Sequence, residues 1–258
     1  MALDGRQFGR ELANSKVFTL EKRWPDAPWF YQILRYVNAL WPRGLAFLPL
    51  FDRCIWFYHP NAVFTERIVE NPLFLKRALS YDTGARILDV GCNGSLMVPY
   101  LLATGYAVDG IDLRPPGYSH PHFRYFQGDV CKLGESWDIE ERYEFIYSIS
   151  VLEHIGLQTE YGVETATGND ALAVRNLRRL LKPAGTFMLS VPFGPARVCP
   201  GFRVYDFPDL QRLCGDINSA HYYVRDGAWW REASREEAEA RETKAIPGSG
   251  LAVVELGP

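Results

Sequence analysis

Residues 87–95 read ILDVGCNGS, a short apolar run that ends in an acid and a glycine-rich turn. The run predicts a buried strand, and the turn, with Gly91 and Gly94, lets the backbone approach a ligand closely before a helix begins near Ser95. Such a turn is typical of α/β proteins that hold a ligand at the carboxyl edge of a sheet. It also occurs as an ordinary strand-to-helix connection, so residues outside it must distinguish the two interpretations.

The residues of this turn disfavour two common ligands. A dinucleotide site requires G-x-G-x-x-G, but counting from Gly91 the third and sixth positions are Asn93 and Leu96. A phosphate-binding P-loop requires Gly-Lys followed by Ser or Thr, which the turn lacks. S-adenosylmethionine carries no phosphate. Its cationic end suits Asp89, and Gly91 lets the chain pass close to its methionine portion.

The next two predicted strands also end in acids. Asp112 closes the second strand, where a carboxylate can accept both ribose hydroxyls of a nucleoside. Asp129 closes the third strand, where a carboxylate can accept from an adenine amino group. Any one of these acids alone would be interpreted as a helix cap or a turn residue. Three at successive strand ends indicate a ligand crevice.

Short apolar runs alternate with helical patterns from about Ala85 onward, which predicts an α/β fold. We expect a Rossmann-like, seven-stranded, mostly parallel sheet with helices on both faces. The strands are expected at Arg86–Val90, Ala107–Ile111, Phe123–Gln127, Glu144–Ile149, Thr186–Val191, Tyr222–Arg225 and Ala252–Leu256. The helices are expected at Ser95–Thr104 before Gly105, at Asp170–Leu181 before Lys182-Pro183, and after the capping box Ser234–Glu237.

The first 80 residues differ from the rest in composition and are rich in aromatic residues. We expect residues 1–80 to form a helical N-terminal extension and residues 81–258 to form the ligand-binding domain. Three roles for the extension stay open: helices packed on the core, a lid over the substrate pocket, and a peripheral contact with a membrane surface. The aromatic residues are Trp24, Trp29, Phe30, Tyr31, Trp41, Phe47, Phe51, Trp56, Phe57 and Tyr58.

Composition disfavours several classes of protein. The net charge of −3 and the pI of about 6.0 do not indicate a basic surface that binds nucleic acid. Five widely spaced cysteines without a CxxC pair fit a reducing cytosol better than a disulfide framework or a zinc site. Acids near the N-terminus argue against a signal peptide, and charges and prolines interrupt the apolar residues 29–58, so no transmembrane helix is expected. We therefore expect a cytoplasmic protein.

Taken together, these motifs resemble the class I S-adenosylmethionine-dependent methyltransferases of the bacterial small-molecule and glycan type. The resemblance covers about residues 85–205 and departs from the usual G-x-G-x-G loop at Asn93 and Ser95, a departure that related sequences tolerate. The motifs that carry it are Leu88–Ser95, Gly110–Asp112, Gly128–Val130, Ser150–Gly156 and Leu180–Gly185.

The resemblance implies an S-adenosylmethionine site at the carboxyl edge of the first four strands. The implied residues are Asp89, Gly91, Cys92 and Asn93 around the methionine end, Asp112 at the ribose with Leu113 beside it, Asp129 and Val130 at the adenine, and Ser148, Ile149 and Ser150 along the methionine side. The thiol of Cys92 is expected to pack inside the protein rather than to act as a nucleophile.

Methyl transfer from a sulfonium is an in-line displacement, so the enzyme chiefly aligns donor and acceptor. An oxygen acceptor must also lose a proton, and His154, in the segment after the fourth strand, is the expected general base. Glu153 could orient a group or bind a divalent metal, although a metal is not favoured; a structural role stays open for both residues. The amine-directed signature Asn/Asp-Pro-Pro-aromatic is replaced by Ser150–Glu153, which favours a hydroxyl oxygen and leaves a carbon acceptor open.

We therefore expect methyl transfer to a hydroxyl of a small-molecule or sugar acceptor, in natural-product or polysaccharide biosynthesis. One alternative is a non-catalytic cofactor-binding partner module, against which the acids and His154 argue. Another is a nicotinamide-dependent sugar oxidoreductase, against which Leu96 argues. Weaker site candidates are His120 and His122 as a metal pair, and Arg197, Arg203 and Tyr205 as readers of an anionic or sugar substrate or as surface residues.

Overall fold

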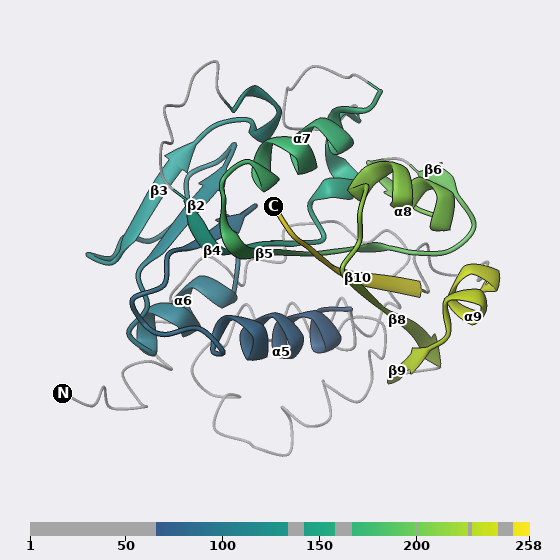
Figure 1. Cartoon of the computed structure of the whole chain (residues 1–258), viewed down its shortest axis with the longest axis horizontal. Coiled ribbons are helices and arrows are strands. Elements are labelled where there is room, and N and C mark those ends of the chain that lie inside the picture. Colours follow the sequence, from purple (N-terminus) through teal and green to yellow (C-terminus); the bar gives the residue numbers. More distant parts are fainter. Residues whose placement is uncertain (1–65, 134–141, 158–166, 200, 227–228, 242–249) are drawn as a thin grey trace, which may run out of the picture. The chain divides into compact units, whose positions relative to one another are not determined.

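The computed structural model describes residues 66–133, 142–157, 167–199, 201–226, 229–241 and 250–258. Within these ranges an eight-stranded sheet runs in the order β3-β2-β1-β4-β5-β10-β8-β9 (Figure 1). Strands β3 to β5 pair in parallel, and β10, β8 and β9 continue the sheet antiparallel. The strands are β1 Ile87–Val90, β2 Val108–Asp112, β3 Phe123–Gln127, β4 Tyr143–Ile149, β5 Leu181–Pro192, β8 Ser219–Asp226, β9 Trp229–Ala233 and β10 Gly250–Leu256.

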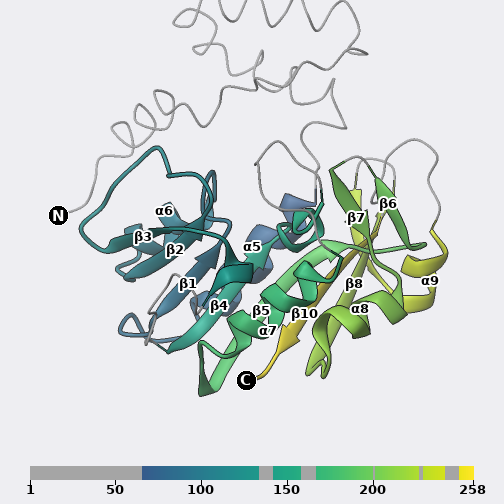
Figure 2. The same cartoon turned by 90° about the horizontal axis from the view of Figure 1, so that it is seen from above.

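Helices cover both faces of this sheet (Figures 1 and 2). On one face, α5 and α6 pack over a core that includes Phe74, Leu101 and Phe145; on the other, α7 and α8 pack over a core that includes Leu177 and Leu213. β1 is buried at every position, as expected of a central parallel strand, and its residues Ile87, Leu88 and Val90 are apolar. The helices are α5 Arg67–Ala78, α6 Met97–Ala103, α7 Asn169–Arg178, α8 Phe207–Cys214 and α9 Arg235–Ala240.

The predicted α/β class and the seven predicted strands are confirmed. The sequence did not predict β9, whose residues Trp-Trp-Arg-Glu-Ala lack the alternation of a half-buried strand and pair only with β8 in the described sheet. It also missed a hairpin formed by β6, Arg197–Cys199, and β7, Phe202–Val204, because three-residue strands leave no periodic signal.

Two predicted helix ends are confirmed and one is wrong. Gly105 follows α6 with a φ of +94°, and the Ser234 side chain caps α9 by accepting from the Glu237 amide. Helix α7, however, ends at Arg178, three residues before the predicted end, and Lys182-Pro183 lies inside β5. Proline is tolerated there because the β4–β5 register shifts between Tyr143 and Phe145, so a regular ladder hydrogen bond is not needed.

The expected domain boundary at residue 80 falls after α5, although α5 packs against the sheet. Phe74 and Ala78 of this helix are fully buried in the core, and the described residues form a compact unit from Glu66 to Pro258. Residues 1–65 of the expected N-terminal extension, with its aromatic residues, lie outside the described residues. None of the helices in the described ranges is long and apolar enough to cross a membrane.

Candidate functional site

The carboxyl ends of β1, β2, β3 and β4 meet at one edge of the sheet, where the chain order reverses between β1 and β4. Val90 at the end of β1 pairs with Ile111 on one side and Ser148 on the other. Gly91 follows with a φ of +84°, and a Cβ there would lie 2.4 Å from Cγ2 of Val151. The loops after β1 and β4 therefore touch, and only glycine allows this approach. Ligands of α/β proteins bind at such a reversal point.

Asp89 lies beneath this loop and is almost fully buried. The Tyr147 hydroxyl donates to its Oδ2 at 2.8 Å. Burial raises the pKa of Asp89 to about 7, against the opposing hydrogen bonds of Ser95 and Tyr147. A cation bound nearby would offset the cost of burying this charge, so the site suits a positively charged group.

Asp112 holds the glycine-rich loop from the end of β2. Its Oδ2 accepts from the Asn93 amide at 2.9 Å, and its Oδ1 accepts from the Arg114 amide at 2.9 Å. Cys92 is fully buried, and a Cβ on Gly110 would lie 2.7 Å from its sulfur, so its thiol packs against β2. Burial raises the pKa of that thiol, which agrees with a packing role for the side chain.

Asp129 follows β3 and caps a short 3₁₀ turn, η3, Val130–Lys132. Its Oδ1 accepts from the Cys131 amide at 2.9 Å, which is the role that a single acid at a strand end often has. The Val130 carbonyl accepts from Asn176 Nδ2, and the Leu113 carbonyl accepts from Gln127 Nε2. The backbone at Leu113, after β2, and at Val130, after β3, is thus held by side-chain hydrogen bonds at the edge where these strands end.

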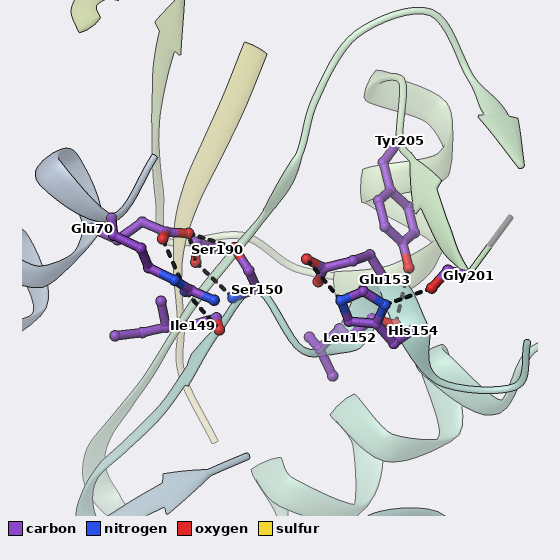
Figure 3. Close-up of polar contacts among 10 residues, drawn as sticks. Glu70, Ile149, Ser150, Leu152, Glu153, His154, Ser190, Gly201 and Tyr205 are labelled. Carbon is purple, nitrogen blue, oxygen red and sulfur yellow. Dashed lines mark hydrogen bonds and ion pairs between the residues drawn. The ribbon is translucent and has the colours of Figure 1, made fainter. Parts of the chain in front are cut away.

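The end of β4 combines a buried polar atom with an unusual backbone conformation. Ser148 is fully buried, and its hydroxyl has no hydrogen-bond partner among the described residues. Ser150 has a φ of +47°, which is rare outside glycine. Its amide donates to Ser190 Oγ at 3.1 Å, and its hydroxyl donates to Glu70 Oε1 at 2.6 Å (Figure 3). A buried polar atom without a partner is often explained by a ligand or water.

Sequence reasoning missed Glu70 and Arg67 of α5, which support the end of β4. Glu70 is fully buried, and its Oε1 also accepts from the Ser190 hydroxyl at 2.6 Å. Burial raises the pKa of Glu70, while Arg67 and the two serines oppose this. Arg67 Nη1 donates to Glu70 Oε2 at 2.9 Å and to the Ile149 carbonyl at 3.0 Å. The available signal was an acid at helical spacing from the apolar residues Phe74 and Ala78.

Glu153 and His154 lie on a 3₁₀ turn, η4, Leu152–His154, directly after β4 (Figure 3). Glu153 is buried, and burial raises its pKa to about 8. Its Oε1 lies 3.8 Å from His154 Nε2, and its buried Oε2 has no hydrogen-bond partner within the part of the chain that the structure describes. The His154 side chain is 43% exposed, and its Nδ1 lies 2.5 Å from the Gly201 carbonyl oxygen.

The weaker site candidates lie in different parts of the structure. Arg203 and Tyr205 contact the η4 segment, whereas Arg197 lies exposed on β6. The rings of His120 and His122 lie 5.6 Å apart on the surface. In the described ranges no three His, Cys, Asp or Glu side chains are grouped so that they could hold a metal ion.

Comparison with known proteins agrees with the geometry. A family model described as a methyltransferase domain matches residues 65–237. The ubiquinone biosynthesis O-methyltransferase of Dechloromonas aromatica is 29% identical over 146 residues, which cover 52% of this chain and 56% of that protein. The protein of the same name from Xanthomonas campestris pv. campestris is 27% identical over 115 residues, covering 42% and 43%. The chain spans about half the length of the curated relatives it matches.

Solved structures share the fold. The 1,6-didemethyltoxoflavin-N1-methyltransferase of Burkholderia thailandensis, with 1,6-didemethyltoxoflavin and S-adenosylhomocysteine bound, gives a TM-score of 0.50 at 18% identity and covers 89% of this chain and 91% of that one. The N-methyltransferase NodS of Bradyrhizobium japonicum, with S-adenosylhomocysteine, gives a TM-score of 0.50 at 14% identity, covering 77% and 89%.

Proposed function

Because this chain belongs to the class I S-adenosylmethionine-dependent methyltransferases, we propose that it methylates a hydroxyl oxygen of a small-molecule or sugar acceptor. The observation that carries the choice of oxygen is the contact between His154 Nδ1 and the Gly201 carbonyl. A carbonyl can only accept, so Nδ1 carries the hydrogen, and the lone pair of the neutral ring belongs to Nε2. A base in this state, directly after β4, supports an acceptor that must lose a proton.

The residues at the strand ends fit S-adenosylmethionine. The buried carboxylate of Asp89 suits a cationic group, Gly91 permits close approach of the backbone, and the buried Ser148 hydroxyl offers a polar contact. Asp112 would hold the ribose, and Asp129 with Val130 would lie at the adenine. When bound, the cofactor supplies a methyl group that is activated by its positively charged sulfur.

His154 would act on the acceptor. The acceptor hydroxyl would give its proton to Nε2, and its oxygen would keep the electron pair that displaces the sulfur of the cofactor from the methyl carbon, leaving S-adenosylhomocysteine. Glu153 lies beside this nitrogen and, with a pKa of about 8, is largely protonated and neutral at pH 7. We propose that Glu153 keeps the His154 ring oriented. Its loss of a proton at higher pH would favour the protonated ring by placing a negative charge 3.8 Å away.

An acceptor panel tests the choice of oxygen. Each scaffold, a phenol and a monosaccharide among them, is supplied as a matched hydroxyl and amine pair, and S-adenosylhomocysteine formation is measured. We expect turnover with the hydroxyl members, because the base removes the proton that the attacking oxygen must lose, and rates at least about tenfold lower for the amines, which gain little from that base. The names of the curated relatives, both O-methyltransferases, support this direction. Faster turnover of the amine members contradicts the proposal.

Binding of S-adenosylhomocysteine should weaken as the pH falls below about 7. The pKa of Asp89 is raised to about 7 in the ligand-free protein, and we expect the ammonium end of the ligand to need the ionised form. Each pH unit below that value should therefore raise Kd about tenfold, since binding must then release a proton. Isothermal calorimetry between about pH 5.5 and 8.5, in buffers of different ionisation enthalpy, measures both Kd and proton release.

Two controls complete this experiment. Asp89→Asn should bind more weakly at pH 8 and lose the pH dependence, because the substituted residue does not titrate. NAD should give no binding heat, since Asn93 and Leu96 occupy two glycine positions of a dinucleotide site. A wild-type Kd that is constant across this pH range would show that Asp89 does not set the affinity. Binding of NAD alone would contradict the cofactor assignment.

A further inference from the structure

The β6–β7 hairpin contacts both ends of the η4 segment and the residue after it, at Leu152, His154 and Ile155. Arg203 lies in β7, and Gly201 and Tyr205 lie immediately before and after the strand. Through these three residues the hairpin reaches His154 and the segment's backbone (Figure 3 shows Gly201 and Tyr205). Strands β6 and β7 form a two-stranded sheet of their own, which meets the large sheet through a bridge between Tyr205 and Phe193.

The first contact selects the tautomer of the neutral ring. Gly201 O lies 2.5 Å from His154 Nδ1, and the ring nitrogen must be the donor. Gly201 has a φ of +87°, a conformation that glycine adopts without a steric cost. The group that meets the imidazole is therefore a backbone carbonyl, whose direction does not depend on a side-chain rotamer.

The second contact fixes the backbone just beyond His154. Arg203 Nη1 donates to the Ile155 carbonyl at 2.6 Å and lies 3.3 Å from Asp170 Oδ2. The side chains of Arg203 and Asp170 are only 14% and 13% exposed. A largely buried guanidinium with a carboxylate partner is held more rigidly than one in solvent, so the Ile155 carbonyl has a defined position.

The third contact joins the hairpin to the sheet. The Tyr205 backbone forms two hydrogen bonds with the residues at and after the end of β5. Its amide donates to Pro192 O at 3.0 Å, and its carbonyl accepts from the Gly194 amide at 2.9 Å. Its hydroxyl lies 3.0 Å from Asp170 Oδ2 and 3.3 Å from Leu152 O. Residues on both sides of Glu153 and His154 are thereby tied to the end of β5.

We propose that the β6–β7 hairpin positions His154, with Arg203 as a positioning residue, and that it selects the ring tautomer whose Nε2 accepts the substrate proton. The inference rests on the proposed role of His154. Arg203 thus acts through η4 and does not read the substrate, which replaces the expectation that it contacts an anionic or sugar acceptor.

The test measures the tautomer directly. Protein with ¹⁵N-labelled histidine is examined by long-range ¹H–¹⁵N correlation at a pH where the ring is neutral, and His154 is assigned from the spectrum of His154→Gln. Wild type should show Nδ1–H. Arg203→Met, which keeps the aliphatic stem, should give a mixture of both tautomers, lower kcat by about 10²-fold and leave the Kd of S-adenosylhomocysteine within about twofold. Arg203→Lys should recover part of kcat.

Further variants keep the outcome decisive if Arg203→Met folds poorly. Tyr205→Phe removes one oxygen and should shift the tautomer ratio and kcat in the same direction by a smaller factor. Arg197→Met, an exposed arginine on the same hairpin, should leave the His154 tautomer unchanged. An unchanged tautomer in folded Arg203→Met and Tyr205→Phe overturns the proposal, whatever happens to kcat. If wild type binds no S-adenosylhomocysteine, the proposed function fails, while the tautomer measurement still decides the role of the hairpin.

Discussion

Replacement of His154 by alanine is expected to lower kcat by about 10²–10⁴-fold, the range that loss of a general base typically costs. The Kd of S-adenosylhomocysteine should change little, because His154 lies after β4 on η4 and not on the loops that follow β1, β2 and β3. The melting temperature should stay close to that of wild type, since the side chain is 43% exposed. Steady-state kinetics, calorimetry and thermal unfolding on the same preparation measure the three quantities.

A matched control is available on β8. His221 is also a partly exposed histidine beside a glutamate, with Nδ1 3.0 Å from Glu232 Oε1. It lies near the start of β8 and not in a segment that follows β1, β2, β3 or β4. His221→Ala should therefore keep kcat within about twofold. Glu153→Gln should lower kcat less than His154→Ala, because it retains a neutral polar group of the same size beside the ring.

Other outcomes would assign different roles to Glu153 and His154. If a chelator abolishes activity, magnesium or manganese restores it, and Glu153→Gln is as harmful as His154→Ala, the two residues bind a metal. If His154→Ala is well folded and turns over at a near-normal rate, His154 has no part in the mechanism, and alignment of donor and acceptor alone explains the rate.

The parts of the fold that the sequence predicted are those specified by local patterns. The strand β1 is buried at every position, and Gly91 in the turn after it has a positive φ. Gly105 marks the end of α6 and Ser234 marks the start of α9, each from a position close to its helix. The convergence of Asp89, Asp112 and Asp129 followed from one rule, that parallel strands end at a common edge. No tertiary contact had to be known for any of these predictions.

The parts that were missed depend on partners far away in the chain. Glu70 and Ser190 are 120 residues apart, and His154 and Gly201 are 47 residues apart. Asp112 accepts from the Arg114 amide and Asp129 from the Cys131 amide, so the interpretation as a turn or cap acid was correct for one oxygen of each side chain. Local pattern reasoning could not show that Arg203 supports η4 instead of facing a substrate, because that depends on how the hairpin folds back onto the end of β5.

Asp112→Ala is expected to weaken binding of S-adenosylhomocysteine by about 10- to 150-fold, which corresponds to the roughly 1.5–3 kcal/mol of a hydrogen bond to a charged group. Asp112 also accepts from the Asn93 and Arg114 amides, so part of the loss could come from a loosened glycine loop. A ligand lacking the 2′-hydroxyl separates the two effects. If Asp112 binds the ribose, the variant should lose much less affinity for this analogue than for S-adenosylhomocysteine.

Asp109→Ala provides the matched control on the same strand. Asp109 is engaged by Arg124 at 2.6 Å and by the Tyr143 hydroxyl at 2.8 Å, three residues before the carboxyl end of β2. This variant should lower the melting temperature and leave the Kd of S-adenosylhomocysteine within about twofold, because it removes a partly buried, ion-paired acid that does not lie at the strand end. Equal losses for both ligands in Asp112→Ala would assign Asp112 to loop support, and an unchanged Kd with a lowered melting temperature would make it purely structural. A loss confined to the ligand with the hydroxyl assigns it to the ribose, since only that contact distinguishes the two ligands.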